Sequence, residues 1–348
     1  MGRNRCSSQW VGAMVVAAVC LAGCLYPAPT PEATSLPDTP MSSPTLEVPA
    51  GTPTPSSPKL ESTGLGVNTG LGNIAWSHDG ELIAYTYAFG VWVVPVGEWD
   101  KTEKVYTAAP PEEYILESRF VIWLPDDKAI GFTLGRPVDA WQTEESMVQL
   151  NLTDRTIAFI SEEKAELIDW SKDGYLLAWR DGAWIFDMNS QTWQPLIDPE
   201  TDSPVGSFPH WTNDDAIVLG RPADWQWSSG TISLVNWQLD QWEDVAIDNR
   251  PVQMTCNSAF PCRPVPSPDG TQLAWIETRA TSDGYSWQIV EYSKGRSETT
   301  VIANGSDYGF ERAQALTWSP DSRSLAFSAL GESGKDRTIW ILDLFPTK

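Results

Sequence analysis

The chain has 348 residues, of which 41% are hydrophobic and 11% aromatic, a composition typical of a folded protein with a sizeable core. Its 46 acidic residues outnumber its 23 basic ones, and the formal net charge of −23 repels nucleic-acid backbones and anionic membrane surfaces. Composition therefore excludes a disordered chain and argues against nucleic-acid binding. The acidic excess predicts a solvated exterior, with a specific cation-binding role as the alternative.

The first residues have the features of an export signal. Arg3 and Arg5 give a positive start, residues 10–22 are apolar, and small residues precede Cys24. The Leu-Ala-Gly-Cys stretch that ends at Cys24 resembles the lipobox of bacterial lipoproteins. This resemblance implies that residues 1–23 are a signal peptide and that Cys24 is lipidated. A signal peptide cut elsewhere, with an incidental cysteine, is the alternative.

Residues 24–63 have the composition of a tether. The stretch from residue 25 to residue 63 contains ten prolines among many Ser and Thr, with almost no large apolar side chain. Such a segment cannot bury a core, and we expect it to stay extended or disordered. The folded part is then residues 64–348.

A tight turn built on Asp recurs six times in that folded part. In each copy, the residue after the Asp is of a type that suits tight turns, and an apolar run begins within a few residues. This pattern predicts a hairpin in each copy. The turn residues are Asp79-Gly80, Asp126-Asp127, Asp173-Gly174, Asp214-Asp215, Asp269-Gly270 and Asp321-Ser322.

A tryptophan precedes the turn in five copies, and Pro266 stands in its place in the fifth copy. The tryptophans are Trp76, Trp123, Trp170, Trp211 and Trp318, and the six positions are spaced by 47, 47, 41, 55 and 52 residues. The apolar runs after the turns are expected as second strands at 82–87, 129–134, 176–179, 216–219, 272–276 and 324–328. Periods of this size with three or four short strands indicate propeller blades.

The fold class expected is all-β, a six-bladed β-propeller with four-stranded blades. The sixth copy ends near the C-terminus without an outer strand, and residues 60–72 precede the first copy without an assigned place. We therefore expect the N-terminal segment to complete the last blade and close the ring. The repeats resemble the TolB-like six-bladed propeller family, whose turn is seen here as Trp318-Ser319-Pro320-Asp321 and whose later strand is seen as Ile339-Trp340.

The sequence offers little for catalysis. Its two histidines, His78 and His210, lie inside the repeat motif, where a structural role is expected. No nucleophile elbow occurs, and His and Cys do not cluster as metal ligands, so no enzyme activity, metal or cofactor is predicted. Calcium binding at the turns is disfavoured because each turn offers too few oxygens.

Two cysteines, Cys256 and Cys262, remain in the folded part after removal of the signal and lipidation of Cys24. In an oxidising compartment the sequence predicts a disulfide between them. So short a loop would stabilise the chain by only about 2 kcal/mol. The expected effect is local pinning of the segment from 249 to 264.

Two connections between second and third strands resemble each other, at 134–141 and 219–227. Both are expected to place Arg, Asp and Trp outside the strands, on the face opposite the Asp turns. The candidate binding residues are Arg136, Asp139, Trp141, Arg221, Asp224, Trp225 and Trp227. Trp and Arg often anchor interfaces. Shared inheritance of the repeats, with the tryptophans folded onto a blade edge, is the alternative.

These features predict a lipid-anchored, extracytoplasmic propeller at the bacterial cell envelope. Its expected role is non-catalytic binding of a protein or peptide partner, with the lipid anchor as its contact with the membrane. A glycan-binding or glycan-cleaving propeller, whose loop tryptophans stack on sugars, is the alternative; cleavage would require two facing carboxylates beside them.

Overall fold

A computed structural model provides the structure of the chain. It describes residues 58–67, 74–87, 89–107, 120–137, 143–198, 203–204, 208–222, 229–247, 249–255, 263–281, 284–296, 298–331 and 337–346. All of them fall in one compact unit, Thr54–Lys348. Within these ranges no helix has the length and apolar character needed to cross a bilayer.

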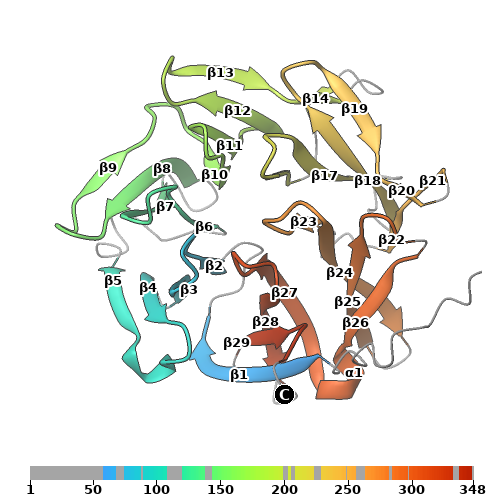
Figure 1. Cartoon of the computed structure of the whole chain (residues 1–348). Helices are drawn as coiled ribbons and strands as arrows, with labels where there is room; N and C mark the ends of the chain where they lie inside the picture. The colour runs from blue at the N-terminus through green and yellow to red at the C-terminus, as the bar shows by residue number, and fades with distance from the viewer. Residues whose placement is uncertain are drawn as a thin grey trace, which may run out of the picture. The chain divides into compact units, whose positions relative to one another are not determined.

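Six antiparallel sheets stand around a common centre as the blades of a propeller (Figure 1). In each blade the strands pair in order from the innermost to the outermost. The predicted all-β, six-bladed fold is therefore confirmed. Blades one to three consist of β2 (Ile74–Trp76), β3 (Leu82–Tyr87), β4 (Gly90–Pro95) and β5 (Glu103–Thr107); β6 (Val121–Trp123), β7 (Ala129–Pro137), β8 (Thr143–Asn151) and β9 (Ile157–Phe159); and β10 (Glu166–Trp170), β11 (Tyr175–Trp179), β12 (Ala183–Asp187) and β13 (Thr192–Pro195).

Blade four gains a fifth strand, because β22 pairs with the start of β18 on the edge that also carries β19. Blades four to six consist of β16 (His210–Trp211), β17 (Ile217–Pro222), β18 (Ser229–Asn236), β19 (Gln241–Asp244) and β22 (Gln253–Thr255); β23 (Val265–Pro266), β24 (Gln272–Thr281), β25 (Gly284–Ser293) and β26 (Thr300–Asn304); and β27 (Phe310–Trp318), β28 (Ser324–Gly331), β29 (Arg337–Asp343) and β1 (Lys59–Gly66). Small elements between them are η1 (Trp99–Lys101), the ladders β14 (Ile197–Asp198) with β15 (Ser203–Pro204) and β20 (Ala246–Ile247) with β21 (Arg250–Pro251), and α1 (Gly305–Tyr308).

The first strand of the chain closes the ring. β1 pairs antiparallel with β29 and is the outer strand of blade six (Figure 1). Side-chain contacts reinforce the pairing, since the buried Thr63 hydroxyl donates to the main-chain oxygen of Ile339 at 2.8 Å. Closure through the N-terminal segment is therefore confirmed, and it covers the edge that β29 would otherwise expose.

The Asp turns form as predicted. In blade one, Asp79 accepts from the Ser77 hydroxyl at 2.7 Å and from the Glu81 amide at 2.9 Å, and Ser77 in turn accepts from the Leu82 amide at 2.9 Å. Blades five and six repeat this network. The residue after the Asp has a positive φ in all six turns, which explains why glycine or a short polar residue stands there. These turns define one face of the ring, here named the turn face.

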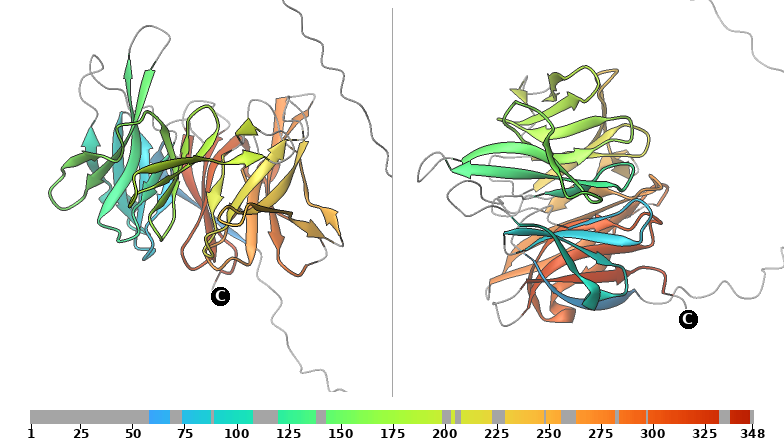
Figure 2. Two further views of the ribbon diagram at one scale, coloured as in Figure 1. Left: turned by 90° about the horizontal axis from the view of Figure 1, so that it is seen from above. Right: turned by 90° about the vertical axis from the view of Figure 1, so that its left-hand side faces the viewer.

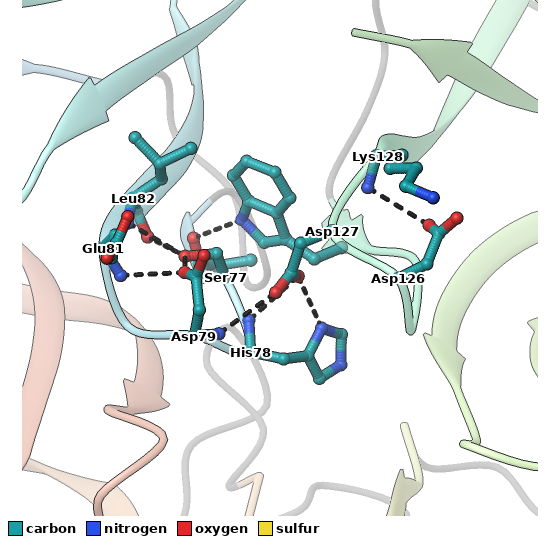
Figure 3. A network of polar contacts seen from close by, with 10 residues as sticks. Ser77, His78, Asp79, Glu81, Leu82, Asp126, Asp127 and Lys128 are labelled. Atoms are coloured by element: carbon teal, nitrogen blue, oxygen red, sulfur yellow. Dashed lines mark hydrogen bonds and ion pairs between the residues drawn. The ribbon is translucent and has the colours of Figure 1, made fainter.

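Neighbouring turns are joined in pairs. The Asp127 carboxylate accepts from the His78 and Asp79 amides of blade one at 2.9 and 3.0 Å (Figure 3). In blade six, the Ser322 hydroxyl accepts from the Asp269 amide of blade five at 3.1 Å. The turns of the odd blades carry glycine at the same position, where there is no side chain to make such a bond. Blades one and two, and five and six, are therefore linked at the turn face.

Each seam between adjacent blades contains its own apolar cluster. The described residues form six such clusters, and the one between blades one and two includes Val93, Val121, Trp123, Ile130 and Val148. The second strands are buried on both faces, which explains their continuous apolar runs. The core is thus a ring of interfaces around the centre.

Several strands are longer than the apolar runs predicted. The second strand of blade four, expected at 216–219 as a short strand, is β17 and continues to Pro222; β7 likewise continues to Pro137. Main-chain pairing with the third strand extends past the point where the apolar pattern stops. Figure 2 shows the hairpin of β7 and β8 projecting from the ring. The ends of these hairpins lie opposite the Asp turns and define the loop face.

Candidate functional site

A cavity of about 410 Å³ lies at the centre of the ring. All six innermost strands contribute to its wall. The residue just before the repeat tryptophan, or before Pro266 in blade five, lines it in every blade; these residues are Ala75, Ile122, Asp169, His210, Val265 and Thr317. Turn residues such as His78, Asn213 and Pro268 also line it, so the cavity reaches the turn face.

A chain of three ionisable side chains crosses this cavity wall. Arg263 Nη2 lies 2.5 Å from His210 Nε2, and His210 Nδ1 lies 3.1 Å from Asp169 Oδ2. Because a guanidinium can only donate, His210 Nε2 accepts, and the ring proton is on Nδ1, which donates to Asp169. Asp169 is itself fixed by the Trp170 and Trp211 amides at 2.7 and 2.9 Å.

Burial and the charge of Arg263 lower the pKa of His210, which keeps its ring neutral. Both ring nitrogens are engaged, one by a donor and one by an acceptor. His210 is therefore held as a link between Arg263 and Asp169 and is not poised to take a proton from a substrate.

Arg263 is held over aromatic rings as well. Its guanidinium carbon lies 4.5 Å from the centre of the Phe120 ring and 5.5 Å from that of Phe208. Burial lowers the pKa of Arg263 to about 9, against the opposing influence of Asp169 and Glu166, so it is still cationic at neutral pH. Blades two, four and five thus meet at one buried cation.

Three N–H donors in the cavity lining are buried without an acceptor. They are Trp76 Nε1, Trp211 Nε1 and Arg263 Nε. The corresponding tryptophans of blades two and six are satisfied instead, since Trp123 Nε1 donates to the Ala75 oxygen and Trp318 Nε1 to the Val265 oxygen. Buried donors are usually paired, so three unused donors around one cavity favour a ligand that brings oxygen acceptors.

On the turn face, Asp215 of blade four lies near Asp173 of blade three. Burial, followed by contact with Asp173, raises the pKa of Asp215. Lys172 lies 3.5 Å from the Asp215 carboxylate. Among the described residues, no three His, Cys, Asp or Glu side chains gather in a geometry suited to a metal ion.

The predicted binding residues are only partly visible. Asp139, Trp141, Asp224, Trp225 and Trp227 lie outside the described residues, and so does the side chain of Arg136. Arg136 and Arg221 belong to β7 and β17, not to the loops in which they were expected, because the hairpin ladders run further than the apolar pattern. Arg221 lies 3.9 Å from Asp244 and 5.7 Å from the centre of the Trp242 ring, within its own blade.

Cys24, Cys256 and Cys262 also lie outside the described residues, so lipidation and the disulfide stay predictions. Residues on both sides of the Cys256 and Cys262 segment are held by contacts. On one side the Thr255 amide donates to the buried Glu277 at 3.1 Å, and on the other Arg263 enters the cavity. The segment between Thr255 and Arg263 therefore has defined ends.

The chain of Arg263, His210 and Asp169 was not predicted from the sequence. The signal was present in part, because Asp169 and His210 both precede the repeat tryptophan, where other blades have Ala75, Ile122 or Thr317. Two ionisable residues at an otherwise uncharged repeat position mark a departure from the pattern. Arg263 gives no such signal, because the fifth copy has Pro266 in place of the repeat tryptophan, so its residues are harder to align with the other copies.

Comparison with known proteins identifies the fold. No protein-family model matches the chain, and no curated protein matches its sequence. The structure of a putative TolB from Agrobacterium tumefaciens is 16% identical with a TM-score of 0.50, over 80% of this chain and 91% of that one. The tricorn protease is 15% identical with a TM-score of 0.52, over 78% of this chain but only 25% of the protease.

A chain of the mitotic checkpoint complex is also similar, with 14% identity and a TM-score of 0.50, over 87% of this chain and 99% of that one. At such identities these likenesses show the fold alone. The chain therefore has a TolB-like six-bladed β-propeller fold, and its function has to be argued from its own residues.

Proposed function

We propose that this chain is a non-catalytic protein- or peptide-binding propeller, held by a lipid on Cys24 at the bacterial cell envelope and facing away from the cytoplasm. The observation that supports binding is the set of buried, unused donors around the central cavity, Trp76 Nε1, Trp211 Nε1 and Arg263 Nε. A peptide segment supplies main-chain carbonyl oxygens at regular spacing, which suits donors on several blades.

The engagement of His210 favours binding over catalysis. Its two nitrogens are committed to Arg263 and Asp169, and burial lowers its pKa. A general base needs an accessible nitrogen within reach of the substrate. His78, the other histidine, donates to Asp127 at 2.7 Å within the turn network.

The anchoring part of the proposal rests on the Leu-Ala-Gly-Cys stretch before Cys24 and on the proline-rich segment after it. Two or more acyl chains hold a protein on a membrane where a single chain is marginal. The test is Cys24→Ser in cells, followed by membrane fractionation and intact mass. Release from the membrane with loss of the acyl mass is expected; an unchanged membrane fraction and mass would contradict lipidation.

The binding part is tested by capture of envelope proteins from solubilised membranes. Trp76→Phe and Trp211→Phe keep an aromatic ring but remove the unused donors, so partner recovery should fall while the melting temperature changes little. Trp99→Phe, in η1 and away from the cavity, is the matched control. Trp141→Ala and Trp225→Ala test the loop face in the same assay. Equal recovery with all variants would contradict both sites.

A further inference from the structure

Arg337 is a buried cation without a partner. It is the first residue of β29, only 6% of its surface is exposed, and its Nε and Nη1 atoms make no hydrogen bond. No carboxylate of the described residues forms an ion pair with it. Buried charges in proteins are normally paired, because an uncompensated charge loses its hydration without replacement.

The surroundings of Arg337 increase this imbalance. Arg337 pairs with Leu330, and Leu330 pairs with Arg312, so the two arginines lie in one row on the same side of blade six. Burial, and to a smaller extent the positive charge of Arg312, lower the pKa of Arg337 to about 10, so Arg337 is protonated at neutral pH.

Arg337 lies at the end of its blade, with its unpaired nitrogens buried. Arg337 begins its strand at the loop face, at the seam between blades six and one, above the apolar cluster that contains Ile339, Val67 and Ile83. The main-chain oxygen of Arg337 accepts from the Val67 amide at 2.9 Å, which fixes the strand end.

We propose that Arg337, with Arg312 beside it, binds the carboxylate of a peptide or small-molecule ligand at the loop-face end of blade six. A guanidinium fork matches the two oxygens of a carboxylate, and charge-assisted pairs of this kind are the strong ones. A singly charged carboxylate compensates the one unpaired guanidinium. A phosphate carries more negative charge than the site lacks, and the chain's net charge of −23 repels it more strongly.

The test uses N-acetylglycine as a carboxylate probe, its neutral amide as the control and inorganic phosphate as the competing anion. The full chain is melted in a buffer without carboxylates or phosphate while each probe is titrated. N-acetylglycine should raise the melting temperature in a saturable way, and the neutral amide should not. A stronger response to phosphate than to N-acetylglycine, or equal responses to acid and amide, would overturn the proposal.

Arg337→Met removes the charge and keeps most of the apolar stem. Without probe its melting temperature should equal or exceed that of the wild type, because an uncompensated buried charge is removed. Its response to N-acetylglycine should be weaker by about tenfold or more. Arg337→Lys, which keeps a charge but not the fork, should respond weakly. Arg279→Met, at a side chain that is 58% exposed, is the control.

A lower melting temperature of Arg337→Met without probe, beyond that of Arg279→Met, would show that a carboxylate of the chain itself already pairs with Arg337. That result would overturn the proposal without affecting the central cavity. Conversely, the capture assay with Trp76→Phe and Trp211→Phe tests the central cavity alone, and its result does not depend on Arg337.

Discussion

The carboxylate of Asp127 accepts hydrogen bonds from the main-chain amide and the ring Nδ1 of His78, at 2.9 and 2.7 Å, across the boundary between blades two and one (Figure 3). Asp127 is the residue after the turn Asp of its own blade and has a φ of 54°. One residue therefore shapes the turn of blade two and caps the turn of blade one. Glycine at the same position, as in Gly80, can shape a turn but cannot cap its neighbour.

Removal of this cap should loosen the joint between the first two blades. Asp127→Ala should lower the free energy of unfolding by about 1–3 kcal/mol, since two main-chain amides lose a charged acceptor and Ala is strained at positive φ. Asp127→Asn keeps one oxygen and tolerates the backbone, so it should cost less. Asp126→Asn, whose carboxylate accepts from the Lys128 amide of its own turn, is the control in urea unfolding. An unchanged midpoint for Asp127→Ala would refute the capping role.

Ring closure by β1 should be essential to stability. Deletion of residues 60–72 exposes the edge of β29 and removes Thr63 and Leu60 from the blade-six interface. The melting temperature should fall by more than about 10 °C, since each kcal/mol lost is worth about 2–4 °C in a domain of this size. Deletion of residues 27–57 should have no measurable effect. Similar losses from both deletions would mean that β1 contributes nothing specific.

Trp123 should be among the most costly tryptophans to truncate. It is 3% exposed in the cluster between blades one and two, and its Nε1 donates to the Ala75 oxygen at 3.1 Å. Trp123→Ala should cost about 3–5 kcal/mol through the cavity that it leaves, whereas Trp123→Phe should cost about 1–2 kcal/mol. Chemical unfolding measures both, with Trp99→Ala as a partly exposed control. A cost equal to that of the control would place Trp123 outside the core.

Asp215 should make the stability depend on pH. Its pKa is raised from an ordinary 3.8 by burial and by Asp173, so the folded chain holds this proton more tightly than the unfolded chain. The stabilisation is present below about pH 4 and is lost as the pH rises through the raised value. The wild type should therefore lose stability relative to Asp215→Asn from about pH 4 upward. Melting curves of the pair across that range would contradict this if their difference stayed constant.

Much of the fold follows from local residue patterns. The Asp turns and the second strands that follow them depend on residues close together in the sequence, and both were predicted. The closing strand was also predictable, because the sixth copy lacked an outer strand and the N-terminal residues 60–72 had no place in any other blade. Strand ends were less predictable, since main-chain pairing continues through Arg136 and Arg221, which interrupt the apolar pattern.

The central site was beyond sequence reasoning for a different reason. Asp169 and His210 are 41 residues apart and His210 and Arg263 are 53 apart, and only the curvature of the ring brings blades three, four and five to one point. Arg337 was equally hidden, because the absence of a partner is a property of packing and not of composition.

Position-specific photo-crosslinking in cells would test the proposed binding function most directly. A photoreactive phenylalanine analogue at Asn213, an exposed residue that lines the cavity, should yield a discrete crosslinked envelope protein. The analogue at Phe159, an exposed position of the outer strand β9 that is 60% accessible, should not. The analogue at Trp225 reports on the loop face in parallel. The same crosslinked product from Phe159, or none from either face of the ring, would contradict a partner-binding propeller.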